Sequence, residues 1–153
     1  MDIAVKEVPS TLYLASTHTT TIPQIEGLAS KITAQLFAAA DQSGLALAGP
    51  MEFHYDGIDG DPQKEFKLVI AVPLVSRPEC APPPFSILET KPFPCAALDY
   101  VGAMAGIRSG YLRLMNGMRE QNLTMSSECR EVYKHWIGPE SPENVTELQY
   151  GIT

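Results

Sequence analysis

The chain has 153 residues, of which 44% are hydrophobic and 19% are charged, and its formal net charge is −7 at pH 7. This length suits one domain with a core of its own, and no apolar run approaches the ~20 residues that a membrane span needs. The eleven Lys and Arg residues are spread singly, which argues against direct nucleic-acid binding because phosphates require clustered cations. The start of the chain lacks the basic and apolar regions of a signal peptide, so we expect a soluble, cytoplasmic protein.

The first predicted helix follows two stretches of β-rich sequence, residues 3–8 and 11–17. Residues 21–24 have the Thr-x-x-Gln spacing of a capping box, with Pro23 in the first turn. Apolar residues then recur at steps of three to four along one side: Ile25, Leu28, Ile32 and Leu36. This spacing predicts an amphipathic helix, and Gly44 is expected to end it as a left-handed cap.

A Pro-rich stretch, residues 77–84, divides the chain after an alternating strand at 65–72. Its prolines exclude a central strand or a helix interior, and we interpret it as a stiff spacer; a docking motif for a proline-binding partner is the alternative. Two further β-rich stretches, 85–90 and 94–101, precede a second helix. This helix is predicted from about Met104 to Gln121, with an apolar side of five residues before the left-handed cap at Asn122: Ile107, Tyr111, Leu114, Met115 and Met118.

The chain therefore reads as a ββαββ unit written twice. Residues 44–55 match residues 122–133 at a constant offset of 78. A second match, shifted by one more residue, aligns 66–72 with 145–151. We predict an α+β fold made of a pseudo-symmetric tandem repeat, with two antiparallel sheets, one main helix each and a ligand cleft between the halves. Repeat one spans about 1–76, the link 77–84 and repeat two about 85–153, and all of 1–153 forms one domain.

The repeat exposes an unusual acid in the predicted strand 129–137. Glu131 stands where the first half has Phe53, and Tyr133 matches Tyr55. Alternate strand residues share a face, and a buried carboxylate without a partner is unfavourable, so that it raises its pKa or acquires a partner. Nearby cations at an exposed edge are one explanation: Arg130, Lys134 and Arg108. The other is a flat organic cation, which a carboxylate among aromatic rings attracts.

The second alignment places Glu147 and Gln149 where the first half has Leu68 and Ile70. Glu147 is expected to serve mainly in a polar network. The three cysteines, Cys80, Cys95 and Cys129, lack the paired spacing of metal or redox motifs. We expect reduced thiols, no metal and no cofactor. Haem binding through a lone histidine is a further hypothesis, with three candidates: His18, His54 and His135.

Several residues of the second half form a signature: Tyr100 before a Gly, Tyr111 three residues before Leu114, the strand Glu131-Val-Tyr133 leading to Trp136, and the closing run 145–149. With these residues the chain resembles the GyrI-like small-molecule-binding domain, which is also the effector-binding half of AraC- and MerR-type multidrug regulators. Residues 53–57 (FHYDG) resemble the first-half counterpart more loosely. The resemblance covers essentially the whole chain. Because the ligand-binding domain accounts for all 153 residues, no DNA-binding segment is expected, and we expect a stand-alone member that is related to transcription regulators.

The resemblance implies helix-on-sheet repeats around a ligand cleft. In such regulators a Glu after the second helix contacts lipophilic cations, and the matching position is Glu131. Ile107 stands where one relative has a Tyr. The residues expected to bind the ligand are Glu131, Tyr133, Trp136, Phe53, Tyr55, Ile107, Tyr111 and Glu147. The expected partner is a hydrophobic or cationic small molecule, with no membrane or nucleic acid, and the protein is expected to be a monomer or a homodimer.

Three functions remain open at this point. Binding of amphipathic, aromatic, cationic molecules is favoured. Some stand-alone relatives hydrolyse reactive cyclopropane-bearing toxins, which would make Glu131 and Tyr133 catalytic through an activated water. A protein-interaction role, such as gyrase inhibition, is the third. Triad chemistry is not expected, because Ser126 and Ser127 have no histidine nearby in sequence.

Overall fold

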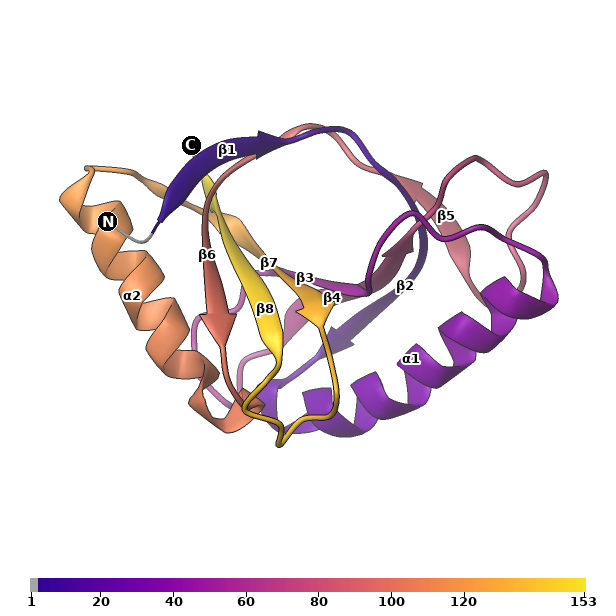
Figure 1. Cartoon of the computed structure of the whole chain (residues 1–153), viewed down its shortest axis with the longest axis horizontal. Helices are drawn as coiled ribbons and strands as arrows, with labels where there is room; N and C mark the ends of the chain where they lie inside the picture. Colours follow the sequence, from indigo (N-terminus) through magenta and orange to yellow (C-terminus); the bar gives the residue numbers. More distant parts are fainter. Residues whose placement is uncertain (1–2) are drawn as a thin grey trace. The chain divides into compact units, whose positions relative to one another are not determined.

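The computed structural model describes residues 3–153, and it contains eight strands and two long helices (Figure 1). The elements of the first repeat are β1 (Ala4–Val8), β2 (Leu12–Thr20), α1 (Ile25–Gln42), β3 (Glu52–Asp56) and β4 (Phe66–Pro73). Those of the second are β5 (Ser86–Glu89), β6 (Phe93–Val101), α2 (Ile107–Glu120), β7 (Met125–His135) and β8 (Val145–Ile152). The predicted ββαββ order, written twice, is therefore confirmed.

The chain divides into two compact units, and each combines strands from both repeats. The middle unit is Ser10–Lys91, and the terminal unit joins residues 3–9 to Pro92–Thr153. The first strand of each repeat pairs with the second strand of the other, because β1 pairs with β6 and β5 pairs with β2. The Pro-rich link lies within the middle unit, where Arg77 and Glu89 form an ion pair of 2.5 Å. As predicted, this link forms neither a strand nor a helix.

The middle unit has its strands in the antiparallel order β3-β4-β2-β5, and α1 contacts β2 and β4. One face of the sheet carries an apolar cluster: Tyr13, Ala15, Val69, Ala71 and Leu88. Strand alternation places another buried set on the opposite face: Leu14, Phe53, Tyr55, Leu68, Ile70 and Val72. β4 is therefore apolar on both faces.

The terminal unit has the antiparallel order β1-β6-β8-β7, with α2 packed against β6 and β8. Its core joins one face of the sheet to the apolar side of the helix: Ala96, Leu98, Tyr100, Leu114, Met118 and Leu148. Gly110 permits the close approach of α2 to the sheet, because a Cβ there would lie 2.9 Å from Leu148 Cδ1 and 3.0 Å from Tyr100 Cδ1. The helix side predicted to be apolar is thus the side that packs.

The helix ends follow the predicted left-handed caps, but the predicted capping box is wrong. Gly44 has φ +66° and Asn122 has φ +58°, each just beyond its helix. A single 3₁₀ turn precedes each helix, and the Thr21 side chain makes no capping hydrogen bond. The hydroxyl of Thr20 instead donates to the Gln24 side chain at 3.3 Å. The extra turn moves the start of α1 to Ile25, so that the Thr-x-x-Gln spacing no longer spans its first turn.

The strand registers correct the predicted alignment of the last two strands. Phe53 of β3 lies opposite Ile70 of β4, and Glu131 of β7 lies opposite Leu148 of β8. Both pairs of counterparts are 78 residues apart, so the shift to 79 is wrong. The sequence could not reveal this, because a strand that is apolar on both faces gives no alternation to align. Glu147 consequently corresponds to Val69, on the other side of the sheet from Leu68.

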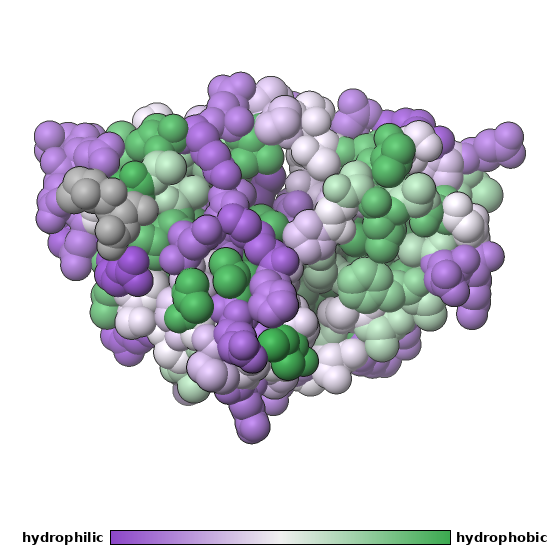
Figure 2. Space-filling view, in the orientation of Figure 1, coloured by the Kyte–Doolittle hydropathy of each residue, from purple (hydrophilic) through white to green (hydrophobic). Residues whose placement is uncertain are grey.

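The exposed surface mixes polar and apolar side chains. Figure 2 shows apolar residues interspersed with polar ones over the face in view. The large hydrophobic residues that are exposed come from many elements: Val5, Phe37, Leu47, Val75, Val101, Leu112, Met125, Trp136 and Ile137. Among residues 3–153, no helix is long and apolar enough to cross a membrane.

Candidate functional site

Glu131 lies in the middle of β7 and is 5% exposed. It is directly opposite Leu148, which belongs to the core under α2, so its side chain shares the face of the sheet that the helix covers. The predicted strand thus exists, although it begins at Met125 and ends at His135. A carboxylate at this depth needs polar compensation, because burial removes its hydration.

Two tyrosine hydroxyls supply polar partners for this carboxylate. Tyr111 of α2 donates a hydrogen bond to Glu131 Oε2, and Tyr133 of β7 donates one to Oε1, each at 2.5 Å. Both carboxylate oxygens therefore accept a phenol, an arrangement that suits an ionised carboxylate because it has acceptors only. α2 and β7 together fix the orientation of the acid.

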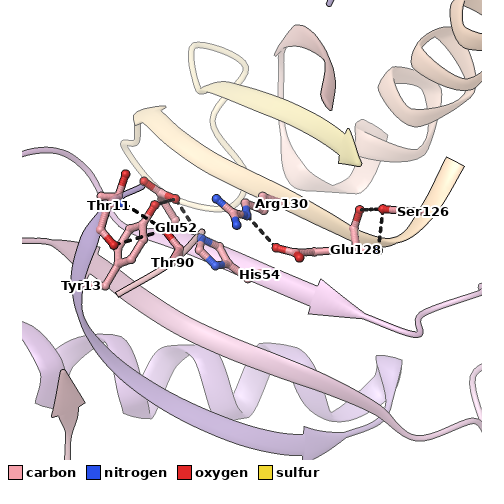
Figure 3. Close-up of polar contacts among 8 residues, drawn as sticks. All are labelled: Thr11, Tyr13, Glu52, His54, Thr90, Ser126, Glu128 and Arg130. Atoms are coloured by element: carbon pink, nitrogen blue, oxygen red, sulfur yellow. Dashed lines mark hydrogen bonds and ion pairs between the residues drawn. The ribbon is translucent and has the colours of Figure 1, made fainter. Parts of the chain in front are cut away.

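Two of the cations considered as partners of Glu131 form ion pairs elsewhere. Arg130 points to the opposite face, where its Nε lies 2.8 Å from Glu128 Oε2 (Figure 3) and its guanidinium stacks 3.9 Å from the Phe93 ring centre. Lys134 pairs with Asp99 at 3.1 Å. Arg108 is exposed on α2. The explanation that rested on an exposed edge does not fit a buried Glu131 with phenol partners.

Two aromatic rings, those of Tyr133 and Trp136, connect Glu131 with the exposed surface. The rings of Tyr133 and Trp136 meet edge-to-face, with centroids 5.4 Å apart and planes at 67°. Trp136 follows the end of β7 and is 46% exposed. Ile107 is partly buried against the core of the terminal unit. The structure thus brings Glu131, Tyr111 and Tyr133 into direct contact and places Trp136 next to Tyr133.

Phe53 and Tyr55 belong to the middle unit, where both are buried on β3. Their ring centroids are 6.4 Å apart, and Tyr55 also contacts Phe66 at 5.9 Å. The registers confirm that Phe53 is the counterpart of Glu131. A position that holds a core hydrocarbon in one repeat thus holds a carboxylate in the other.

Glu147 of β8 lies opposite Val132 and Asp99, so its side chain is on the other face of the terminal unit's sheet from Glu131. It pairs with Lys6 at 2.5 Å and accepts a hydrogen bond from Gln149 at 3.0 Å. Burial raises the pKa of Glu147, but these partners and the charge of Lys134 outweigh burial, so the pKa falls below its ordinary value.

A hollow of about 450 Å³ adjoins Glu147 in the terminal unit. Its lining combines three cations with two carboxylates: Ala4, Lys6, Ala97, Leu98, Asp99, Arg113, Lys134 and Glu147. The Lys6–Glu147 and Lys134–Asp99 ion pairs already engage both carboxylates. The polar network expected for Glu147 is therefore present.

A cluster that sequence reasoning missed lies in the middle unit, around Glu52 (Figure 3). Tyr13 donates a hydrogen bond to Glu52 Oε1 at 2.9 Å, and His54 Nε2 lies 2.9 Å from the same oxygen. The Tyr13 and His54 rings meet edge-to-face at 5.2 Å. Glu52 and His54 are two residues apart on β3, but nothing in the sequence shows that β2 brings Tyr13 to them.

The part of the chain that the structure describes holds no group of three or more His, Cys, Asp or Glu side chains that could bind a metal ion. Cys80 is exposed, whereas Cys95 and Cys129 are buried, and all three are free thiols. Burial raises the pKa of the Cys95 thiol.

No family model and no curated protein matches the sequence. Solved structures do match. The C-terminal domain of EcmrR is 17% identical with a TM-score of 0.78, and the match covers 99% of this chain and 96% of that domain. The chain has the GyrI-like fold. This pseudo-symmetric α+β fold is what the sequence signature predicts. In a complex of EcmrR with DNA, the match spans 56% of the EcmrR chain.

Two further structures share the GyrI-like fold. SAV2435 bound to tetraphenylphosphonium is 13% identical with a TM-score of 0.70, and the match covers 100% of this chain and 94% of SAV2435. A hydrolase encoded by lin2189 from Listeria innocua is 12% identical with a TM-score of 0.72, at 99% and 92% coverage. At identities this low, the structural similarity establishes a common fold and nothing more.

Proposed function

We propose that the protein binds amphipathic, aromatic, cationic small molecules and that Glu131 supplies the counter-charge. The observation that supports this most is the buried carboxylate of Glu131, which holds a phenol hydroxyl at each oxygen. Phenols solvate a charge without neutralising it. A bound cation would bring an opposite charge close to this carboxylate in a poorly hydrated setting, where such attraction is strongest.

The aromatic side chains next to Glu131 suit the same class of ligand. Tyr111, Tyr133 and Trp136 present ring faces and edges, and ring faces attract cations by about 0.5–2 kcal/mol each. A ligand with delocalised charge and apolar rings gains from both interactions and loses little hydration. The tetraphenylphosphonium bound to SAV2435 has this chemistry, within the same fold.

The binding test compares Glu131→Gln with Glu147→Gln, the same substitution on the opposite face of the same sheet. Fluorescence or calorimetric titration of tetraphenylphosphonium should show at least about tenfold weaker binding for Glu131→Gln, which corresponds to roughly 1.4 kcal/mol. Glu147→Gln should bind within about twofold of wild type. Neutral triphenylphosphine oxide should not distinguish wild type from Glu131→Gln. Equal affinity of wild type and Glu131→Gln for the cation would remove the proposed counter-charge.

Hydrolysis is a second candidate, favoured by the short contacts between Glu131 and two phenols. A carboxylate can orient a water for attack on an electrophilic carbon while a tyrosine hydroxyl protonates the leaving carbon or oxygen. The test incubates the protein with a cyclopropane-bearing electrophile and follows the addition of one water by mass. Turnover that disappears in Glu131→Gln and in Tyr133→Phe would favour the enzyme, whereas unchanged substrate at high protein concentration would favour binding alone.

A further inference from the structure

A serine and a histidine lie side by side on β2 of the middle unit. Ser16 and His18 are two residues apart on the strand, so their side chains share a face. Ser16 Oγ lies 2.6 Å from His18 Nε2. Both residues are half-buried, and among residues 3–153 neither side chain has another hydrogen-bond partner. This separation is the one required between an activated nucleophile and its base.

The protonation state of His18 suits a base. Burial lowers the pKa of His18 below its ordinary value of 6.5, so the imidazole is neutral at pH 7. A neutral imidazole with its proton on Nδ1 accepts from the serine hydroxyl through Nε2. The serine O–H then points along the path of proton transfer.

The strand around this pair has an open edge. β5 pairs with β2 only as far as Ala15, opposite Ser86, so from Ser16 to Thr20 the described strands pair β2 on the β4 side alone. Peptide N–H groups at such an edge are available donors for a carbonyl oxygen. On the β4 side, Ile70 lies opposite Ser16 and Leu68 lies opposite His18, and both are fully buried. The neighbourhood is therefore apolar with donors at one side.

We propose that Ser16 and His18 form a nucleophile–base dyad that hydrolyses esters with small apolar acyl groups. Ser16 Oγ forms a bond to the ester carbonyl carbon while its proton passes to His18 Nε2. The tetrahedral intermediate collapses, the alcohol leaves with that proton, and an acyl-Ser16 ester remains. Water then attacks the acyl carbon while its proton passes to His18 Nε2, and His18 returns that proton to Ser16 Oγ as the carboxylic acid leaves. The step needs no oxidant, metal or cofactor.

The surroundings select the substrate class. Leu14, Leu68 and Ile70 share the face of the dyad and favour an apolar acyl group over a charged one. No described carboxylate is hydrogen-bonded to His18. A dyad without such an orienting acid is a weaker base system, so esters with good leaving groups are the expected substrates, rather than amides.

The test uses p-nitrophenyl acetate with the whole protein, followed by intact mass and peptide mapping. Wild type should acquire one acetyl group on Ser16 and release p-nitrophenol faster than buffer. Ser16→Ala should lose the adduct, and His18→Gln should slow its formation by about 10²-fold or more. Thr17→Ala, a change on the other face of the same strand, should behave as wild type. The rate should stay level above pH 7 and fall once the pH drops below the His18 pKa.

Two results would overturn the dyad. One is an adduct that persists on lysine, tyrosine or His18 in Ser16→Ala at the wild-type rate, and the other is a wild-type rate equal to that of buffer. Labelling of Ser16 by a fluorophosphonate probe gives an independent readout, since it requires the activated hydroxyl and not turnover. Tetraphenylphosphonium titration tests the ligand-binding proposal and acylation of Ser16 tests the dyad, so failure of the one and failure of the other are separable.

Discussion

At residue scale, the defining feature is the exchange of Phe53 for Glu131 between equivalent strands. Phe53 contributes to an apolar face in the middle unit, whereas Glu131 requires polar partners and obtains hydroxyls from Tyr111 and Tyr133. Because the two phenols come from different elements, one acid ties α2 to β7. The charge is thus held in place by contacts that an apolar residue could not make.

Removing one phenol should destabilise the fold. Tyr111→Phe leaves Glu131 Oε2 without this donor, and losing a hydrogen bond to a buried charged group costs about 1.5–3 kcal/mol. Urea unfolding should show this loss in the free energy of unfolding at pH 7. The control is Tyr150→Phe, because the half-buried Tyr150 makes no hydrogen bond through its hydroxyl among residues 3–153. This control should stay within about 0.5 kcal/mol of wild type. Equal losses in the two variants would contradict the role given to Tyr111.

Sequence reasoning found Glu131 because the repeat supplied a comparison at that position. The pair Ser16–His18 was missed for a specific reason: the predicted strand stopped at residue 17, which left His18 outside it, whereas β2 continues to Thr20. The cluster around Glu52 was missed because Tyr13 is 39 residues away in sequence and meets it only through the sheet. Contacts within one strand are readable from spacing, but contacts across strands require the register.

At element scale, the two helices differ in how closely their glycines approach a sheet. Gly110 and Gly117 of α2 are buried, and a Cβ at Gly117 would lie 2.8 Å from Ile3 Cγ2. A Cβ at Gly27 of α1 would have no heavy atom within 4 Å beyond its two chain neighbours and the backbone of its own helix. Glycine therefore serves packing in α2 and only lowers helix propensity in α1.

This contrast predicts opposite effects for one substitution. Gly27→Ala should raise the free energy of unfolding by about 0.5–1 kcal/mol, because alanine is the better helix former and meets no obstacle. Gly110→Ala should lower it by about 1–3 kcal/mol, because the added methyl overlaps Leu148 and Tyr100. Thermal or urea unfolding measures both. A stabilised Gly110→Ala would show that α2 does not pack as closely as described.

The helices were predictable and the last strand register was not. Helix faces and left-handed ends are marked by periodic apolar residues and by Gly44 and Asn122. The prediction of which β8 residues share a face depended on aligning β8 with β4, whose residues are buried on both faces. A strand of that kind offers no polar alternation, so the one-residue error placed Glu147 on the wrong face.

At the scale of the whole molecule, the sequence repeats and the compact units do not coincide. β1 belongs to the terminal unit through β6, and β5 belongs to the middle unit through β2. Cutting the chain at the end of the first repeat therefore separates β1 from β6 and β2 from β5, whereas β2 keeps its pairing with β4. That the whole of 1–153 acts as one domain stays a prediction.

Two fragments should show experimentally that the first strand of each repeat depends on a strand of the other repeat. The fragment 10–91 contains every strand of the middle unit, whereas 1–76 carries β1 without β6 and β2 without β5. Hydrogen exchange should show slower exchange of the β2 amides that face β5, around Leu12–Ala15, in 10–91 than in 1–76, because an unpaired edge is open to water. The β1 amides of 1–76 should exchange as in an unfolded chain, and their protection would show that β1 does not depend on β6.

The pairing of Ala4 with Ala97 has a consequence for the newborn chain. The first strand leaves the ribosome more than ninety residues before its neighbour exists, a wait of about 5–20 seconds at ordinary translation speeds. During that interval a lone strand could pair with the wrong chain. Lys6 and Glu7 give this strand a charge of each sign on its two faces, which helps to keep it dissolved until the sixth strand has been made.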